Sequence, residues 1–246
     1  MRRTRTRILA LSLALIVSSC AKNAARERSA DLAASRAVTF SSADGVRLSG
    51  RLFGRGHVGV VLSHMLPADQ TSWWDFAREL ADRGYLALTY DFRGYCPGDA
   101  GCSQGDKVIA AIWQDVLGAI DEIRSEGATR VVLIGASMGG TASLVAASQP
   151  DLDVEAVVTL SAPMSIEGLV ADADTLAGVT AAKLFLAGSG DAQAAESAQD
   201  LYAVAPQPKT VQILPSDDHG TDLLTGNQSG VVQTAIFQYL ERYAAP

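Results

Sequence analysis

The stretch Gly135-Ala136-Ser137-Met138-Gly139-Gly140 decides the fold of this chain, because an apolar run precedes it and an Ala-rich, helix-like segment follows it. The preceding run, residues 130–134 (RVVLI), is typical of a buried strand. A serine between glycines, on a sharp turn from strand to helix, fits the G-x-S-x-G pattern that exposes a nucleophilic hydroxyl above a sheet. The sequence therefore predicts Ser137 as a candidate nucleophile, with the N–H of Met138 pointing where an oxyanion would develop.

A nucleophilic serine needs a general base, and the chain has three histidines, His57, His64 and His219. Only His219 lies downstream of Ser137, in the chain order that this arrangement requires. It follows the apolar run 211–214 in a stretch whose Pro, Ser and Asp residues are typical of a loop leaving a strand. A loop histidine is often only a solvated surface residue, but position and order favour His219 as the base.

Asp191 is the candidate for orienting that histidine. It follows the buried-strand pattern of residues 183–188, which places it at the carboxyl end of a strand, where open α/β sheets carry functional residues. A carboxylate at this position can fix the imidazole tautomer and stabilise the imidazolium. Asp217 and Asp218 are the alternatives, and their place beside the histidine on a short loop is typical of solvated turn residues.

With serine, aspartate and histidine in this order, the chain resembles the α/β-hydrolase family from about residue 37 to its end. Residues 37–40 and 46–52, joined by Asp44-Gly45, resemble the opening hairpin of that family. Asp91-Phe92-Arg93-Gly94 resembles its D-x-R-G loop. The resemblance implies an α/β fold with a mostly parallel eight-stranded sheet, helices on both faces and no large cap.

The hydrophobic pattern predicts the elements of such a fold. Strands are expected at residues 57–64, 85–90, 130–134, 156–160, 183–188 and 211–214. Helices are expected at residues 72–83, 107–126, 141–148, 192–205 and 231–243, with Val108 on the apolar face of the second. Residues 165–179 are left over and are too short for a large lid, so we expect a shallow, open site that accepts a range of acyl groups.

The loop after residues 57–64 departs from the family pattern. Where many relatives have His-Gly, this chain has His64-Met65-Leu66-Pro67. By position, Leu66 would donate the second oxyanion N–H beside Met138. Because methionine lacks glycine's access to positive φ, a different loop path with Met65 as the donor is the alternative. We expect His64 to brace the loop.

Length and composition are those of one domain. The chain has 246 residues, and 48% of them are hydrophobic, enough for a large core. The formal net charge of −7 argues against nucleic-acid binding. A G-x-x-x-x-G-K-[ST] phosphate loop is absent and the three histidines are scattered, so we expect neither a metal nor an organic cofactor.

The N-terminus has the pattern of a signal peptide over residues 1–19. Four arginines precede an apolar run, residues 8–17, that is too short to span a bilayer. Residues 17–20 (VSSC) resemble a bacterial lipoprotein signal, which predicts a lipidated Cys20, a tether over residues 20–36 and a hydrolase domain over residues 37–246. The lipid would anchor the protein to a membrane of the bacterial envelope. An ordinary cleaved signal, giving a soluble secreted or periplasmic protein, is the alternative.

Two further cysteines, Cys96 and Cys102, flank a short Gly- and Pro-containing loop. Outside the cytosol we expect them to form a disulfide, and two unpaired thiols are the alternative.

These residues predict a serine hydrolase that cleaves carboxylic esters of small or medium acyl groups through an acyl-serine intermediate. A peptidase or amidase, a thioesterase or a dienelactone-type hydrolase would use the same residues. A surface lipoprotein that keeps the fold only for binding is a further alternative. The sequence leaves the oligomeric state open.

Overall fold

The computed structural model describes residues 29, 31–98 and 101–246. The predicted signal peptide, Cys20 and most of the predicted tether lie outside these residues. The described part of the chain contains no helix with the length and apolar character that a bilayer-spanning segment needs.

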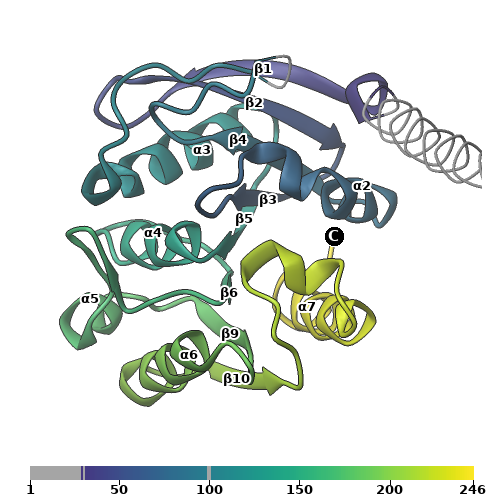
Figure 1. Ribbon diagram of the computed structural model, residues 1–246. Coiled ribbons are helices and arrows are strands. Elements are labelled where there is room, and N and C mark those ends of the chain that lie inside the picture. The colour runs from purple at the N-terminus through teal and green to yellow at the C-terminus, as the bar shows by residue number, and fades with distance from the viewer. Residues whose placement is uncertain (1–28, 30, 99–100) are drawn as a thin grey trace, which may run out of the picture.

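One large sheet runs through the described residues (Figure 1). Its eight strands have the spatial order β1-β2-β4-β3-β5-β6-β9-β10. They are β1 (Ser35–Ser41), β2 (Arg47–Gly54), β3 (Val58–Ser63), β4 (Leu86–Asp91), β5 (Arg130–Ala136), β6 (Ala156–Leu160), β9 (Ala182–Gly188) and β10 (Lys209–Leu214). Strand β2 is antiparallel to both of its neighbours, and all pairings from β4 to β10 are parallel. The predicted mostly parallel, eight-stranded sheet is confirmed.

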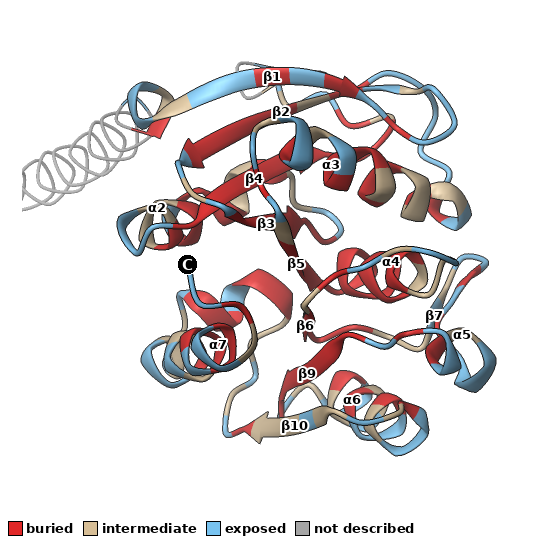
Figure 2. Cartoon of the chain, turned by 180° about the vertical axis from the view of Figure 1, so that it is seen from behind, coloured by how far each residue is buried: buried red, intermediate tan, exposed pale blue. Residues whose placement is uncertain are grey.

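Helices cover both faces of the sheet, so the central strands β3, β4 and β6 are buried along their whole length and are mostly apolar. One face carries α3 (Trp113–Ser125), α4 (Met138–Ala147), α5 (Ala173–Ala177) and α6 (Ala192–Val204). The other carries α2 (Trp74–Asp82) and α7 (Ser229–Ala244). Along β5, Val131 and Leu133 contact the first layer, whereas Val132 and Ile134 contact the second. Figure 2 shows the buried residues concentrated on the strands and on the inner sides of the helices.

The residues left over by the sequence pattern form a small addition beside α4. A two-stranded hairpin, β7 (Ser165–Ile166) and β8 (Leu169–Val170), is followed by the short helix α5. As expected, residues 165–179 are too few to form a large lid.

Four predicted helices begin at other residues than expected, and for two of them the difference exceeds two residues. The helix expected from residue 107 starts at Trp113, after the 3-10 turn η2 (Ile109–Ala111). Val108 has extended backbone and is 48% exposed, so its assignment to the apolar face was wrong. The reason is that this segment still belongs to the loop after β4, where Lys107 lies over the ring of Tyr95. Helix α4 starts at Met138 rather than at residue 141, because the turn at Ser137 enters the helix directly.

The folded part of the chain also extends further toward the N-terminus than the sequence pattern indicates. Strand β1 begins at Ser35, and Asp31 forms an ion pair with Arg78 at 2.7 Å. The guanidinium of Arg51 donates to Ser35 Oγ at 2.7 Å and to the carbonyl of Leu32 at 3.0 Å. The last residues of the predicted tether therefore pack on the domain.

Arg93 of the D-x-R-G sequence joins three segments of the chain. Its guanidinium donates to Asp44 in the β1–β2 turn, at 2.7 and 2.9 Å, and to Asp115 on α3, at 2.6 and 2.9 Å. The backbone N–H of Arg93 donates to Asp115 at 2.9 Å. Hydrogen bonds from Arg93 lower the pKa of Asp44 to about 2. This network fixes the loop after β4 against the hairpin and α3.

The register of the parallel strands places six loops at one edge of the sheet. Ser63 pairs with Gly135, Ala136 pairs with Leu160, and the last residues of β9 and β10 pair with each other. The loops after β4, β3, β5, β6, β9 and β10 therefore leave the sheet at the same edge, in the spatial order of their strands. The predicted residues Met65, Leu66, Ser137, Asp191 and His219 lie in these loops, and Met138 begins α4.

Candidate active site

Ser137 occupies the turn between β5 and α4 with φ 47 and ψ −119, a conformation that non-glycine residues rarely adopt. A Cβ on Gly135 would lie 2.3 Å from the carbonyl oxygen of Gly139, and a Cβ on Gly139 would lie 2.4 Å from that of Ser63. Only glycine fits at either position. The N–H of Ser137 donates to the carbonyl of Leu160 at 2.8 Å, which ties the turn to β6.

Asp191 and His219 come together from the loops after β9 and β10. His219 Nδ1 lies 2.5 Å from Asp191 Oδ2, so the carboxylate accepts and the imidazole carries a proton on Nδ1. The other carboxylate oxygen, Oδ1, accepts from the N–H of Ala194 at 3.4 Å and caps the start of α6. Among the three candidate aspartates, Asp191 holds the histidine. Asp218 instead accepts from the Ser216 hydroxyl at 2.6 Å.

Ser137, Asp191 and His219 line one cavity of about 240 Å³. The other lining residues come from the segment after β6 and from the first turns of α6: Ser161, Pro163, Ser165, Ile166, Gln193, Ala194 and Ser197. The side chain of His219 is 42% exposed and that of Asp191 19% exposed, so the cavity opens to solvent. Between the described side chains of Ser137 and His219 there is no hydrogen bond. Contacts of this kind often tighten only when substrate binds.

The loop after β3 is held by His64. Its Nδ1–H donates to the carbonyl of Met65 at 3.0 Å, and its Nε2 accepts from the N–H of Phe92 at 3.1 Å. Acceptance by Nε2 requires the neutral ring with its proton on Nδ1, and complete burial lowers the pKa of His64 to about 4. This is the bracing role that the sequence suggested for His64.

The same contact orients the next peptide group. In a trans peptide the C=O and N–H point in opposite directions, so the N–H of Leu66 faces away from the His64 ring. The side chain of Met65 is buried against Gly220, whereas Leu66 is 37% exposed. Met138 is the first residue of α4, and its N–H has no partner within the helix. None of these three donors is among the described residues that line the cavity.

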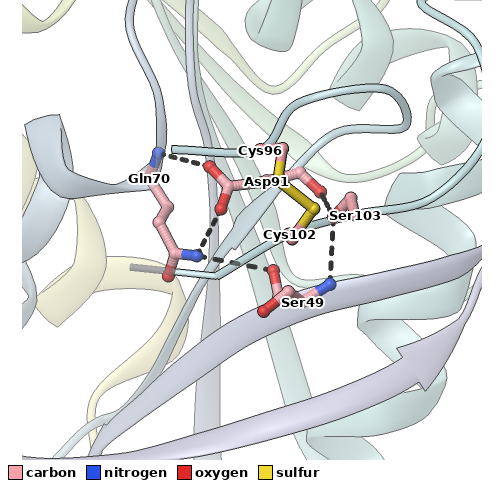
Figure 3. The surroundings of a disulfide bond; sticks show 6 residues. All are labelled: Ser49, Gln70, Asp91, Cys96, Cys102 and Ser103. Carbon is pink, nitrogen blue, oxygen red and sulfur yellow. Dashed lines mark hydrogen bonds between the residues drawn. A yellow bond between two sulfur atoms is a disulfide. The ribbon is translucent and has the colours of Figure 1, made fainter. Parts of the chain in front are cut away.

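Cys96 and Cys102 form a disulfide with an S–S distance of 2.06 Å. Figure 3 shows this bond beside Asp91 at the end of β4. The hydroxyl of Ser103 donates to the Asp91 carbonyl at 2.6 Å and accepts from the N–H of Ser49 at 3.0 Å. The disulfide loop is thereby tied to β2 and β4.

Asp91 also links this loop to the 3-10 turn η1 (Gln70–Trp73). The backbone N–H and the side-chain amide of Gln70 donate to its carboxylate at 3.0 and 2.6 Å (Figure 3). Burial raises the pKa of Asp91 to about 6. Tyr95, next to Cys96, packs edge-on against His64 with ring centroids 4.6 Å apart. The disulfide loop and the loop after β3 are therefore in contact.

Ser161 is a site residue that sequence reasoning missed. It lines the cavity, and its Oγ accepts from the N–H of Gly220 at 3.0 Å. A serine directly after the predicted strand 156–160, at the same sheet edge as the nucleophile, was the available signal. No group of three or more His, Cys, Asp or Glu side chains that could hold a metal ion occurs among the described residues.

Comparison with known proteins identifies the family. Residues 60–204 match the family described as alpha/beta hydrolase fold, and this match covers more than half of the chain. The chain belongs to the α/β-hydrolase family. No curated protein matches it significantly.

Solved structures of esterases have the same fold. An esterase of Pyrococcus furiosus aligns with a TM-score of 0.71 and 17% identity, over 85% of this chain and 92% of its own. A thermophilic esterase of Thermogutta terrifontis aligns with a TM-score of 0.67 and 19% identity, over 84% and 98%. The esterase domain of a Rhodothermus marinus protein aligns with a TM-score of 0.65 and 21% identity, over 85% and 98%.

Proposed function

We propose that this protein is a serine hydrolase that cleaves carboxylic esters of small or medium acyl groups. One observation carries the proposal: Ser137, Asp191 and His219 leave three different strands and line one cavity, with the carboxylate bonded to Nδ1 of the imidazole. This is the arrangement that activates a serine hydroxyl. Membership of the α/β-hydrolase family and the likeness to solved esterases support it.

The proposed reaction has two stages. In the first, Nε2 of His219 takes the hydroxyl proton while Ser137 Oγ attacks the ester carbonyl carbon, and the C–O bond then breaks as His219 protonates the leaving alcohol. In the second, His219 deprotonates a water molecule that attacks the acyl-serine, and the carboxylic acid leaves as Ser137 regains its proton. Asp191 keeps the imidazole oriented throughout.

The oxyanion that forms in both stages needs two N–H donors. Met138 supplies one, at the N-terminal end of α4, where the helix dipole also favours negative charge. We assign the second to Leu66, because the bond from His64 to the Met65 carbonyl turns the Leu66 N–H away from the buried ring. Met65 is the alternative donor.

The size of the cavity supports small or medium acyl groups. Its volume of about 240 Å³ is below the roughly 300 to 1,000 Å³ of pockets that hold drug-sized ligands. Ser165 and Ile166 of the β7–β8 segment form part of its wall. A long acyl chain would have to extend into solvent.

A hydrolysis panel tests the proposal. Purified protein is assayed with p-nitrophenyl esters of increasing acyl length and with matched amides and thioesters. We expect ester turnover that falls by several orders of magnitude in Ser137→Ala, whereas Ser148→Ala, at the opposite end of α4, retains it. Near-normal turnover by Ser137→Ala would refute the assignment. A preference for the amides or thioesters would favour a peptidase, an amidase or a thioesterase, and no turnover of any substrate would favour a binding lipoprotein.

We further propose that a lipid on Cys20 anchors this hydrolase to a membrane of the bacterial envelope. The support is the VSSC sequence that ends the apolar run of the predicted signal peptide. The acyl chains would bind by hydrophobic transfer, at about 0.8 kcal/mol per buried CH₂ group.

A further inference from the structure

The carboxyl end of β6 contacts the segments that carry the proposed catalytic residues. The carbonyl of Leu160 accepts from the N–H of Ser137 at 2.8 Å. The N–H of the next residue, Ser161, donates to the carbonyl of Leu186 at 2.7 Å, in β9, the strand that leads to the proposed carboxylate. The carboxyl end of β6 is therefore hydrogen-bonded both to the proposed nucleophile and to the neighbouring strand β9.

The side chain of Ser161 makes the third connection, to the histidine loop. Its Oγ accepts from the N–H of Gly220 at 3.0 Å, and this N–H belongs to the peptide group that follows His219. Gly220 is also closely packed against Met65, since a Cβ there would lie 2.4 Å from Met65 Sδ. The backbone next to His219 is thus in contact with both Ser161 and Met65.

Ser161 has a backbone conformation that is unfavourable for any residue with a side chain. It has φ 56, in the left-handed region, where glycine fits without strain and other residues do not. Ser161 is also 1% exposed and lines the cavity beside Ser137. A buried hydroxyl kept in a strained conformation, with its oxygen bonded to the neighbour of the proposed base, points to a role in placing that base.

We propose that Ser161 is a positioning residue of the esterase reaction, whose hydroxyl fixes the distance between His219 and Ser137. The inference rests on the proposed function. Because Leu160 holds the nucleophile and Ser161 holds the histidine loop, the two reacting side chains are set relative to each other by adjacent residues. Loss of the Ser161 oxygen frees the His219 loop and leaves the nucleophile in place.

The test uses the leaving-group dependence of kcat/KM for a series of aryl acetates. A misplaced His219 protonates the leaving group less well, so the loss should grow as the leaving alcohol becomes more basic. For Ser161→Ala we expect about a 10-fold loss with p-nitrophenyl acetate and about a 100-fold loss with phenyl acetate, mainly in kcat. Equal losses along the series, or no loss, would overturn the proposal.

Two further variants keep the outcome interpretable. Ser161→Gly removes the hydroxyl and also the strain at φ 56, so it should fold even if Ser161→Ala does not. Full activity of Ser161→Gly would refute the role of the oxygen. Ser42→Ala is the matched control, because the buried Oγ of Ser42 likewise accepts a backbone N–H, from Val46 at 2.8 Å, in the β1–β2 turn. We expect its activity to be unchanged.

The two proposals fail in different ways. If Ser137→Ala remains active, the proposed function is wrong. If Ser137→Ala is inactive while both Ser161 variants match Ser42→Ala along the whole series, the proposed function stands and only the role of Ser161 is refuted.

Discussion

At the scale of single residues, the site depends on backbone conformations that side chains normally avoid. Ser137 and Ser161 both lie in the left-handed region, at φ 47 and φ 56. Such a conformation costs an L-residue roughly 1 to 2 kcal/mol, and the surrounding hydrogen bonds must offset that cost. The carboxylate of Asp191 makes two contacts: one of its oxygens caps α6 and the other bonds to His219. Removing this carboxylate would release both the helix start and the imidazole.

His64 provides a prediction about pH. Burial lowers its pKa from 6.5 to about 4, so the unfolded chain binds a proton at His64 more readily than the folded protein does. The stability that neutral His64 contributes is complete above pH 6.5 and is lost as the pH falls toward 4. The full loss is on the order of 3 kcal/mol.

Urea unfolding of the wild type and of His64→Gln, at neutral pH and at about pH 5, measures this loss. We expect the wild type to lose more stability than the variant on acidification. Asp91 acts in the opposite direction, because its raised pKa favours the folded protein at low pH, but its contribution cancels when the two proteins are compared. Parallel pH dependences in the two proteins would show that the folded state does not keep His64 neutral.

At the scale of elements, the strands were predictable and several boundaries were not. Residues 156–160 form β6 as expected, because a strand covered on both faces is recognisable from its nearly continuous apolar run. Val108 was misassigned because helical spacing alone does not reveal that Lys107 packs on Tyr95 and keeps this segment in the loop. The role of Ser161 depends on a contact with Gly220 across the sheet edge, and no local pattern encodes such a contact.

The candidate residues Ser137, Asp191 and His219 could be proposed from the sequence because each follows a recognisable strand. The sequence does not show which of Asp191, Asp217 and Asp218 contacts the histidine. In the structure Asp191 does, through its hydrogen bond to Nδ1 of His219. The path of the loop after β3 was harder to predict, since it depends on the buried contacts of His64 with Met65 and Phe92.

The disulfide loop gives a prediction about stability. Cys96 and Cys102 are separated by 6 positions, and closing so short a loop contributes roughly 2 to 2.5 kcal/mol in the chain-entropy model. Reduction, or the double substitution Cys96→Ala and Cys102→Ala, should lower the Tm by about 4 to 10 °C. Differential scanning calorimetry with and without reductant measures the shift. Two reactive thiols in the denatured, unreduced protein would contradict the disulfide.

At the scale of the whole molecule, the topology assembles the site. The strand order brings β5, β6, β9 and β10 side by side, so loops that are distant in sequence leave the sheet at one edge. Two helical layers bury both faces of the sheet (Figures 1 and 2), and the candidate site lies at the edge formed by the carboxyl ends of its parallel strands.

The lipid anchor is the prediction that concerns the chain as a whole. In a bacterial host, we expect the wild type to enter the detergent phase of a Triton X-114 extraction and Cys20→Ser to remain in the aqueous phase. Ester hydrolysis per molecule should be the same for both, because the proposed site lies within the folded domain. Mass spectrometry of the mature wild type should find an acylated N-terminal cysteine. An unmodified N-terminus would favour a soluble exported protein.

The central claim is that His219 makes the hydroxyl of Ser137 reactive, and covalent labelling tests it most directly. The protein is treated with a fluorophosphonate and the modified residue is identified by peptide mass spectrometry, in the wild type and in His219→Ala. We predict stoichiometric modification of Ser137 in the wild type and labelling slower by several orders of magnitude in the variant. Failure of the wild type to react, modification of a different residue, or equal labelling rates in the two proteins would contradict the account.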